Sequence, residues 1–282
     1  MYRWIYKYYT YQRYKYLKDI ANLKERKVDL GGHHFSVFYR LGSGSPILFL
    51  HGLLDACYGF RRLLSHLEVT NPIYLMDIPG FGKSKVPPMK YLYQIPIFAD
   101  LIYATIQELG LKHITLLGHS MGGLIAQHIC LRDNTQSIQK LILVASGGTP
   151  HPERDKMRDI LFPQTEENVI RLLDYLFYQD VPQPNGLEKK ILMQAWNSFG
   201  YQSLTANTLA DEKKVFIGNK ASMIQVPTLI LAGEHDEITS PVMMQEMKAY
   251  IPNSTMKLIP KAKHAIHIEQ PKLLAEEIIR FL

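Results

Sequence analysis

A serine flanked by glycines marks the sharpest turn signal in this sequence. The apolar, strand-type run 113–117 leads into Gly118-His119-Ser120-Met121-Gly122, and a helix-compatible run, 124–130, follows. Strand, turn and helix in this order hold the serine in a strained backbone conformation, where side chains on the flanking residues would clash. The hydroxyl then stands at a helix N-terminus, which favours developing negative charge. Ser120 is therefore a candidate nucleophile, and the alternative is a glycine-rich turn of another α/β fold.

A serine hydroxyl is a poor nucleophile unless a base lies beside it and a carboxylate orients that base. Asp236 lies three residues past Gly233, at the end of an apolar strand-type run, and is the best-placed acid. The carboxylates of Glu234 and Glu237 are the alternatives. The loop after the last strand-type run holds two histidines: His264 is closer to the strand end, and His267 is the alternative. The order nucleophile, acid, histidine is the one expected after such a serine turn.

Acyl chemistry at a serine also needs N–H donors for the oxyanion that forms. One donor is the backbone N–H of the residue after the nucleophile, Met121. The second should come from a loop after an earlier strand, and the run 46–50 ends in His51-Gly52-Leu53. We therefore expect the Leu53 N–H to be the second donor, with His51 fixing the loop.

The amino-acid composition narrows the classes of protein to which this chain could belong. The chain has 282 residues, of which 46% are apolar and 21% charged, as in ordinary globular proteins. Its two cysteines form neither a disulfide framework nor a metal cluster, and no zinc, dinucleotide or phosphate-loop motif is present. We expect no metal and no cofactor. The sparse cysteines fit a cytoplasmic location.

The positive charge is concentrated at the start of the chain. Residues 1–27 carry eight basic and two acidic residues, whereas the other 255 residues carry 24 of each. The first sixteen residues hold seven tyrosines and one tryptophan, without the apolar core of a signal peptide or a spanning helix. Interleaved aromatic and basic residues suit an anionic membrane surface, which predicts a peripheral arm over 1–27. The alternative is a helix packed on its own domain; nothing else in the chain supports nucleic-acid binding.

Short apolar strands alternate with helices from residue 28 to 148 and again over 224–282, which predicts a parallel sheet. Residues 149–223 break this alternation with helical, proline-punctuated sequence rich in large apolar side chains. We interpret 149–223 as a helical lid inserted into the core. Its expected substrate contacts are large aromatic side chains: Phe162, Phe177, Trp196 and Phe199.

Taken together, the chain from about residue 28 onward resembles the α/β-hydrolase fold family. The resemblance rests on His51-Gly52, residues 77–84 (DIPGFGKS), the Ser120 turn, residues 233–236 (GEHD) and residues 264–271. It implies a mostly parallel eight-stranded sheet, flanked by helices, with the lid after strand 6, and the triad Ser120, Asp236 and His264. Serine at this position speaks against the branches that use an aspartate nucleophile.

Within the family, the basic aromatic arm, residues 118–123 and the lid stretch 177–182 (FYQDVP) look like membrane-associated monoacylglycerol lipases and bacterial esterases. One departure is Lys263, because many relatives have glycine before the histidine. The resemblance implies a serine carboxylic-ester hydrolase that acts on acyl glycerides or similar esters. The same triad would serve a carbon–carbon-bond hydrolase, an acyltransferase or a peptidase, which a polar or cationic lid cavity would favour. A non-enzymatic interaction protein on this fold is the last alternative.

Overall fold

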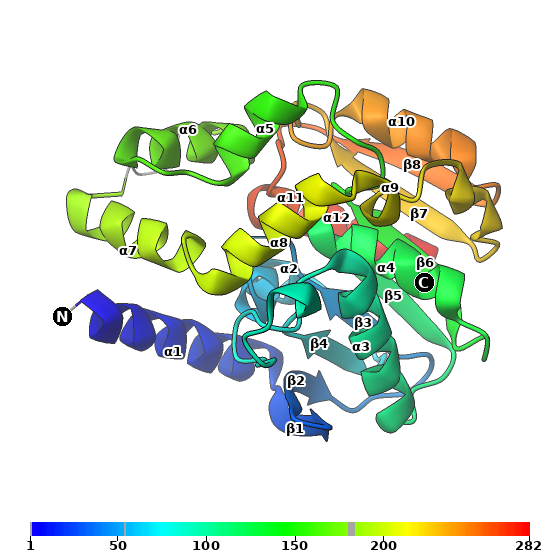
Figure 1. Ribbon diagram of the computed structural model, residues 1–282. Coiled ribbons are helices and arrows are strands. Elements are labelled where there is room, and N and C mark those ends of the chain that lie inside the picture. The colour runs from blue at the N-terminus through cyan, green and yellow to red at the C-terminus, as the bar shows by residue number, and fades with distance from the viewer. Residues whose placement is uncertain (1, 54, 180–183) are drawn as a thin grey trace.

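The computed structural model describes residues 2–53, 55–179 and 184–282. The described residues form an eight-stranded sheet in the order β1-β2-β4-β3-β5-β6-β7-β8 (Figure 1). β1 and β2 are antiparallel to each other, β2 is antiparallel to β4, and the remaining neighbours are parallel. The predicted fold class is confirmed. The strands are β1 Lys24–Leu30, β2 His33–Arg40, β3 Ile47–Leu50, β4 Ile73–Met76, β5 Ile114–His119, β6 Ile138–Val144, β7 Thr228–Gly233 and β8 Ser254–Ile259.

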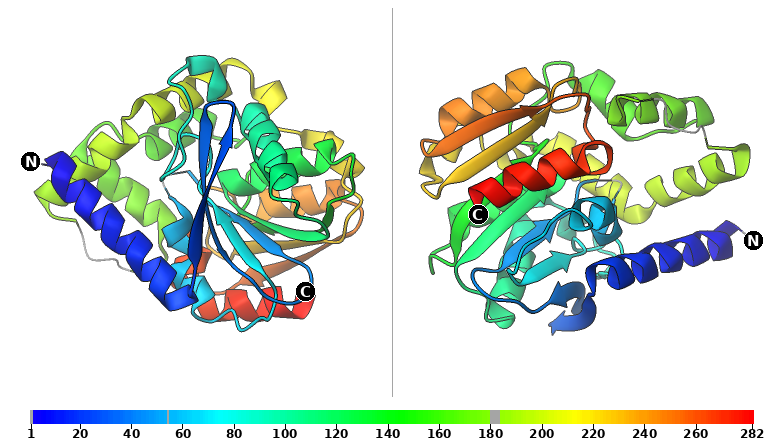
Figure 2. Two further views of the ribbon diagram at one scale, coloured as in Figure 1. Left: turned by 90° about the horizontal axis from the view of Figure 1, so that it is seen from below. Right: turned by 180° about the vertical axis from the view of Figure 1, so that it is seen from behind.

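Helices cover both faces of the sheet. One buried cluster joins the sheet to α1, α2 and α12, and a second joins it to α3, α4 and α10. Figure 2 shows α1 and α12 together on the side seen from behind. The helices are α1 Tyr2–Ala21, α2 Arg61–Leu64, α3 Ile95–Glu108, α4 Met121–Arg132, α5 Arg154–Leu161, α6 Glu166–Leu176, α7 Gly186–Trp196, α8 Phe199–Ala210, α9 Glu212–Val215, α10 Pro241–Tyr250, α11 Ile266–Glu269 and α12 Pro271–Phe281, with 3-10 turns Cys57–Phe60, Lys90–Leu92 and Gly218–Met223.

The strand order places a crevice beside Ser120. The chain passes from β3 outward to β4, and then returns to the other side of β3 as β5. Strands β3 and β5 are buried along their whole length, as expected for parallel strands covered on both faces. Where the strand order reverses in this way, the loops at the carboxyl ends of the two strands separate and leave a crevice. The loop after β3 holds Leu53, and the loop after β5 holds Ser120.

The N-terminal segment is a helix whose second half belongs to the core. Tyr14, Leu17 and Ala21 are buried. The Tyr14 hydroxyl donates a hydrogen bond of 2.5 Å to the buried Asp77 carboxylate, and its ring stacks on Phe38 at 5.2 Å. Burial, and then the Asp77 carboxylate, raises the pKa of Tyr14 far above its usual range. The expected separation of an arm over 1–27 from a body that begins at 28 is therefore not observed.

Two further observations concern the same segment. Strand β1 begins at Lys24, inside the predicted arm, because residues 24–30 pair with β2. None of the helices in the described ranges combines the length and the apolar character needed to cross a membrane. Among the residues of α1 whose exposure is described, those on the face opposite Tyr14 and Leu17 are exposed, and Tyr9 and Tyr11 are 52% and 61% exposed.

The segment between β6 and β7, which we call the lid segment (149–223), is helical in its described parts. It contributes α5 to α9 and lies over the carboxyl edge of the sheet (Figure 1). The predicted lid stretch 177–182 is described only as far as Gln179; its residues 180–182 lie outside the described ranges. Leu54, next to the expected oxyanion donor, also lies outside them.

Candidate active site

Ser120 stands on a strained turn between β5 and α4. Its φ of 52° and ψ of −118° lie in a region that a side chain disfavours, and such strain persists only where the surroundings enforce it. The turn fits because Gly122 passes close to the end of β3: a Cβ there would lie 2.3 Å from the Leu50 carbonyl oxygen. The Ser120 carbonyl accepts the N–H groups of Gly123 and Gly147 at 3.0 and 3.1 Å.

Ser120 lies at one end of a chain of hydrogen bonds. The Ser120 hydroxyl oxygen Oγ is 2.8 Å from His264 Nε2, and His264 Nδ1 is 2.9 Å from Asp236 Oδ2. His264 and Asp236 are 3% and 2% exposed, so water does not compete for these bonds. With a proton on Nδ1 donated to Asp236, Nε2 is free to accept the serine proton. The structure brings the three predicted residues into contact from the ends of β5, β7 and β8.

The alternative acids and the alternative base point elsewhere. Glu234 and Glu237 are exposed, and they pair with His235 and Lys263. His267 is buried, and its ring faces the rings of His119 and Phe60 at 4.3 and 5.4 Å. Its Nε2 lies 3.3 Å from Asp55 Oδ2. These residues support the loops around the site, whereas His264 is the histidine beside Ser120.

Thr239 is a site residue that the sequence reasoning missed. Its hydroxyl donates to Asp236 Oδ2 at 2.8 Å, and its backbone N–H donates to Asp236 Oδ1 at 3.1 Å. The N–H of Ile238 donates to the same Oδ1 at 2.8 Å. Three donors thus hold the carboxylate toward His264. The available signal was the spacing, because Asp side chains commonly accept backbone N–H groups two and three residues ahead.

The two residues predicted to supply the oxyanion donors come from the loop after β3 and from the first position of α4. Leu53 and Met121 both line the cavity that contains Ser120 and His264. The loop after β3 approaches the serine closely, since a Cβ on Gly52 would lie 3.1 Å from Ser120 Cβ. His51 holds this loop: its Nε2 accepts the Ile78 N–H at 2.9 Å, so the proton is on Nδ1, which donates to the Gly52 carbonyl at 2.8 Å.

His119 fills the space beneath the site. Its Nε2 donates to the His264 carbonyl oxygen at 3.0 Å, and its ring lies 5.2 Å from that of His264. Burial, and then the neighbouring His267 and His264, hold the pKa of His119 well below its usual range. His119 is therefore a neutral packing residue at neutral pH.

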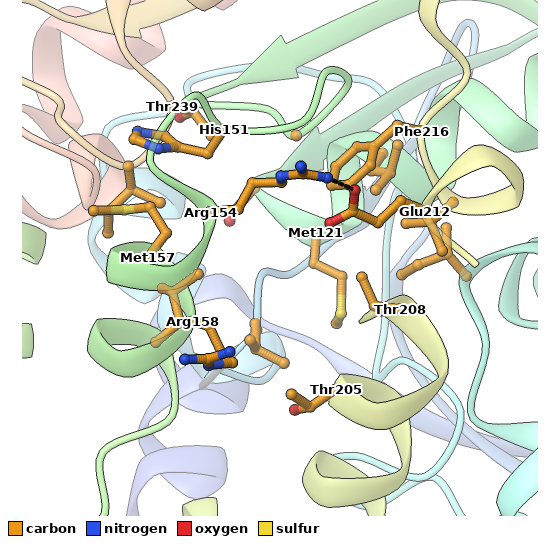
Figure 3. Close-up of a pocket in the computed structure, with 18 of the residues that line it drawn as sticks. Met121, His151, Arg154, Met157, Arg158, Thr205, Thr208, Glu212, Phe216 and Thr239 are labelled. Carbon is orange, nitrogen blue, oxygen red and sulfur yellow. Dashed lines mark hydrogen bonds and ion pairs between the residues drawn. The ribbon is translucent and has the colours of Figure 1, made fainter. Parts of the chain in front are cut away.

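A cavity of about 210 Å³ is lined by Ser120 and His264 together with residues of the core and of the lid segment. Figure 3 shows side chains that line it. The lid segment contributes most of its apolar wall, and the core contributes the rest. The apolar lining residues are Leu53, Ile95, Met121, Leu124, Met157, Leu161, Phe162, Leu176, Leu204, Leu209, Val215, Phe216, Ile238 and Met243. Such a wall is complementary to a hydrocarbon chain.

The expected aromatic contacts of the lid need correction. Phe162 lines the cavity, whereas Phe177, Trp196 and Phe199 are not among the described residues that line it. Trp196 is buried within the lid packing. Phe199 is 48% exposed and packs edge-on against Tyr93 at 5.5 Å. The lid segment lines the cavity mainly from α5, α9 and the second half of α8, whereas Phe177 and Trp196 stand at the ends of α6 and α7 and Phe199 begins α8.

The cavity also contains charged side chains, and each arginine is already paired. Arg154 of α5 reaches across to Glu212 of α9 at 2.5 Å, as Figure 3 shows. Arg158 is bonded to Asp155 and Asp159 at 3.1 and 3.0 Å. A cationic cavity would favour one of the rival reactions. Here the two cations are neutralised within the chain.

Neither cysteine is a competing nucleophile. Burial raises the pKa of the Cys130 thiol to about 12, and burial and Asp77 raise the pKa of Cys57 well above its usual range. A thiol in such surroundings stays protonated and inert at neutral pH. Within the described ranges, no group of three His, Cys, Asp or Glu side chains is arranged to hold a metal ion.

Comparisons with known proteins agree with this architecture. The model of the alpha/beta hydrolase fold family matches residues 45–271. The uncharacterized hydrolase YugF of Bacillus subtilis (strain 168) is 24% identical over 277 residues, which are 94% of this chain and 100% of YugF. The crystal structure of a membrane phospholipase A superposes with a TM-score of 0.83 at 20% identity, covering 98% of this chain and 91% of that one.

The carboxylesterase CesB of Bacillus subtilis superposes with a TM-score of 0.77 at 19% identity over 98% of both chains. At these identities the solved structures establish the fold alone. The family match covers most of the chain, and it includes the strand ends that carry Ser120, Asp236 and His264. This chain belongs to the α/β hydrolase fold family.

Proposed function

We propose that this protein is a serine carboxylic-ester hydrolase that acts on acyl glycerides or similar esters with an apolar acyl chain. One observation carries the proposal: the hydrogen-bonded chain Ser120–His264–Asp236 opens directly into an apolar cavity. A buried base and acid supply the chemistry, and the cavity supplies a place for a hydrocarbon chain.

The reaction follows from the proposed roles. Ser120 Oγ forms a bond to the ester carbonyl carbon while His264 Nε2 takes the serine proton. The carbonyl oxygen becomes an oxyanion, which the N–H groups of Leu53 and Met121 stabilise. The bond to the alcohol then breaks, and His264 returns the proton to the departing oxygen. Water attacks the acyl-enzyme by the same steps in reverse, and the acid leaves.

The rival reactions have less support. A carbon–carbon-bond hydrolase, an acyltransferase or a peptidase with a polar substrate would be served by charged groups that are free to bind it, and Arg154 and Arg158 already have carboxylate partners. A non-enzymatic interaction protein would not need the buried contact between His264 and Asp236.

An ester panel of increasing acyl length tests the function. We expect kcat/KM to rise from acetyl esters upward by up to about fourfold per methylene until the cavity is full, because each buried methylene contributes about 0.8 kcal/mol. Leu161→Trp should remove the gain for longer chains and leave acetyl esters nearly unchanged, since Leu161 lines the cavity. Leu187→Trp, on the exposed surface of α7, is the matched control. Equal kcat/KM at every length, or no ester hydrolysis at all, would contradict the proposal.

We further propose that the outer face of α1 contacts an anionic membrane surface. Helix α1 has five basic residues and one acidic residue, and Tyr9, Tyr11 and Tyr16 on it are more than half exposed. Tyrosine rings suit the headgroup level of a bilayer, and each nearby lysine or arginine adds about 1 kcal/mol of attraction to anionic lipid. The buried residues Tyr14 and Leu17 hold the helix in place, so that its outer face stays presented.

Vesicle binding tests this contact without disturbing the core. Because Tyr14 is buried, removal of residues 1–27 would damage the fold, and surface substitutions are the sharper tool. Tyr11→Ser with Lys15→Gln should weaken binding to anionic vesicles by at least about fivefold, and hydrolysis of a soluble short ester should not change. Tyr91→Ser with Lys90→Gln is the matched control, since Tyr91 is 58% exposed on a different element. Equal loss in both double variants, or none in either, would argue against the contact.

A further inference from the structure

The backbone around the candidate base is held at three successive groups. The Lys263 N–H donates to Glu269 Oε2 at 2.9 Å, and the His264 carbonyl accepts from His119 at 3.0 Å. The Ala265 N–H donates to the Leu176 carbonyl oxygen at 2.9 Å. The last of these partners belongs to the lid segment, at the end of α6. The loop that carries His264 is therefore bonded directly to the lid.

Glu269 extends the same connection. Its Oε1 accepts the N–H of Tyr178 at 2.6 Å and that of Gln179 at 3.3 Å, while Oε2 accepts the N–H of Lys263. One carboxylate thus binds the stretch that follows α6 with one oxygen and the residue before the base with the other. We call residues 174–179, at the end of α6 and just beyond it, the strap.

Two side-chain contacts reinforce the strap. Lys263 Nζ donates to the Asp174 carbonyl at 2.6 Å and lies 3.4 Å from Glu237. The Tyr178 ring stacks on His235, with ring centroids 4.6 Å apart, directly before Asp236 in sequence. The strap consequently touches both the loop of the candidate base and the loop of the candidate acid. Leu176, within it, also lines the cavity.

We propose that Glu269 is a positioning residue of the proposed reaction: it fastens the strap to the His264 loop, so that the seated lid segment holds His264 in line with Ser120 and Asp236. This inference rests on the proposed function. The physical reason is the narrow tolerance of proton transfer, because a misplacement of about 1 Å can cost about 10²-fold in rate. Among the three backbone groups named above, the Lys263 N–H is held by Glu269 and the Ala265 N–H by the strap, and the strap lies far from His264 in sequence.

Glu269→Gln is the first test. An amide offers one accepting oxygen and one donating NH2 group, so it cannot accept N–H groups on both sides. We expect kcat on a soluble short ester to fall by about 10- to 100-fold with KM within about twofold, because the base rather than the cavity is disturbed. Glu246→Gln is the matched control: Glu246 is exposed on α10, and the Tyr250 hydroxyl at 3.3 Å is a neighbour on the same helix.

A second variant covers the case in which Glu269→Gln does not fold. Lys263→Met removes the Nζ contacts with Asp174 and Glu237 and keeps the backbone N–H that binds Glu269. A smaller fall in kcat, again with KM retained, is expected. Thermal melting of both variants separates misplacement of the base from unfolding.

The rate at which a small fluorophosphonate labels Ser120 separates failure of this inference from failure of the proposed function. Labelling needs the activated serine and not the natural substrate, so it should slow in parallel with kcat. If the wild-type protein is labelled but hydrolyses no ester, the proposed function is refuted. The labelling rates of the variants then still test the role of Glu269. Unchanged kcat and labelling in folded variants would overturn the inference. A raised KM for long esters with unchanged kcat would also overturn it, since Glu269 would then only shape the cavity. Wild-type protein that is neither active nor labelled would overturn both.

Discussion

Replacing Ser120 with alanine should lower kcat for ester hydrolysis by about 10⁴- to 10⁶-fold, because the proposed covalent intermediate can then no longer form. The variant should stay folded, since the Ser120 hydroxyl bonds only to His264 among its described partners and the strained turn is held by backbone contacts. The measurement is kcat on the preferred ester, together with the mass of the protein after fluorophosphonate treatment.

The control is Ser222→Ala, because Ser222 is exposed and far along the chain from the site. It should keep full activity and become labelled like the wild type. Near-normal esterase activity in Ser120→Ala, or labelling at another residue, would refute Ser120 as the nucleophile. Residual activity well above the uncatalysed rate is still expected, because the oxyanion donors and the cavity remain.

Replacing Asp236 with asparagine should lower kcat by about 10⁴-fold with little change in geometry. The N–H groups of Ile238 and Thr239 both point at Oδ1, so the amide oxygen of asparagine should take that position. Its NH2 group then occupies the place of Oδ2 and donates toward His264 Nδ1. That contact favours the tautomer with the proton on Nε2, which cannot accept the proton of Ser120.

The matched controls are the two carboxylates that the sequence left as alternatives. Glu234→Gln and Glu237→Gln should each change kcat by less than about threefold, since their side chains are exposed and face away from His264. The measurement is kcat of all three variants on one short ester, which shows which carboxylate the reaction needs. If Glu234→Gln or Glu237→Gln lowered kcat as much as Asp236→Asn, Asp236 would not be the residue that orients His264.

The fold class and the spatial proximity of the three site residues could be predicted because both depend on local sequence patterns. Ser120, Asp236 and His264 each come soon after an apolar strand, and parallel strands present their carboxyl ends along one edge of a sheet. The spacing of the glycines around Ser120 predicted the sharp turn that carries it. The family match confirms the fold that these patterns predicted.

The residues of the lid segment that line the cavity, and the boundary of the N-terminal arm, could not be predicted from local sequence patterns. Hydrophobicity marks Trp196 and Phe199 as large apolar residues, but it does not say which neighbour each will meet. In α1, the abundance of tyrosine and basic residues favoured the prediction of a peripheral arm at a membrane surface. The spacing of Tyr14, Leu17 and Ala21, which share one face of a helix, was the sign that this helix packs on the domain.

By itself, the sequence determined the order of strands and helices, the strained turn at Ser120 and the strand ends that carry Asp236 and His264. These features follow from periodicity and turn chemistry over a few residues. Only the tertiary structure decided that Tyr14 binds Asp77, 63 residues away, and that Glu269 binds Tyr178, 91 residues away. Such contacts depend on how separate elements pack together, and no local pattern records which partner each polar group will find.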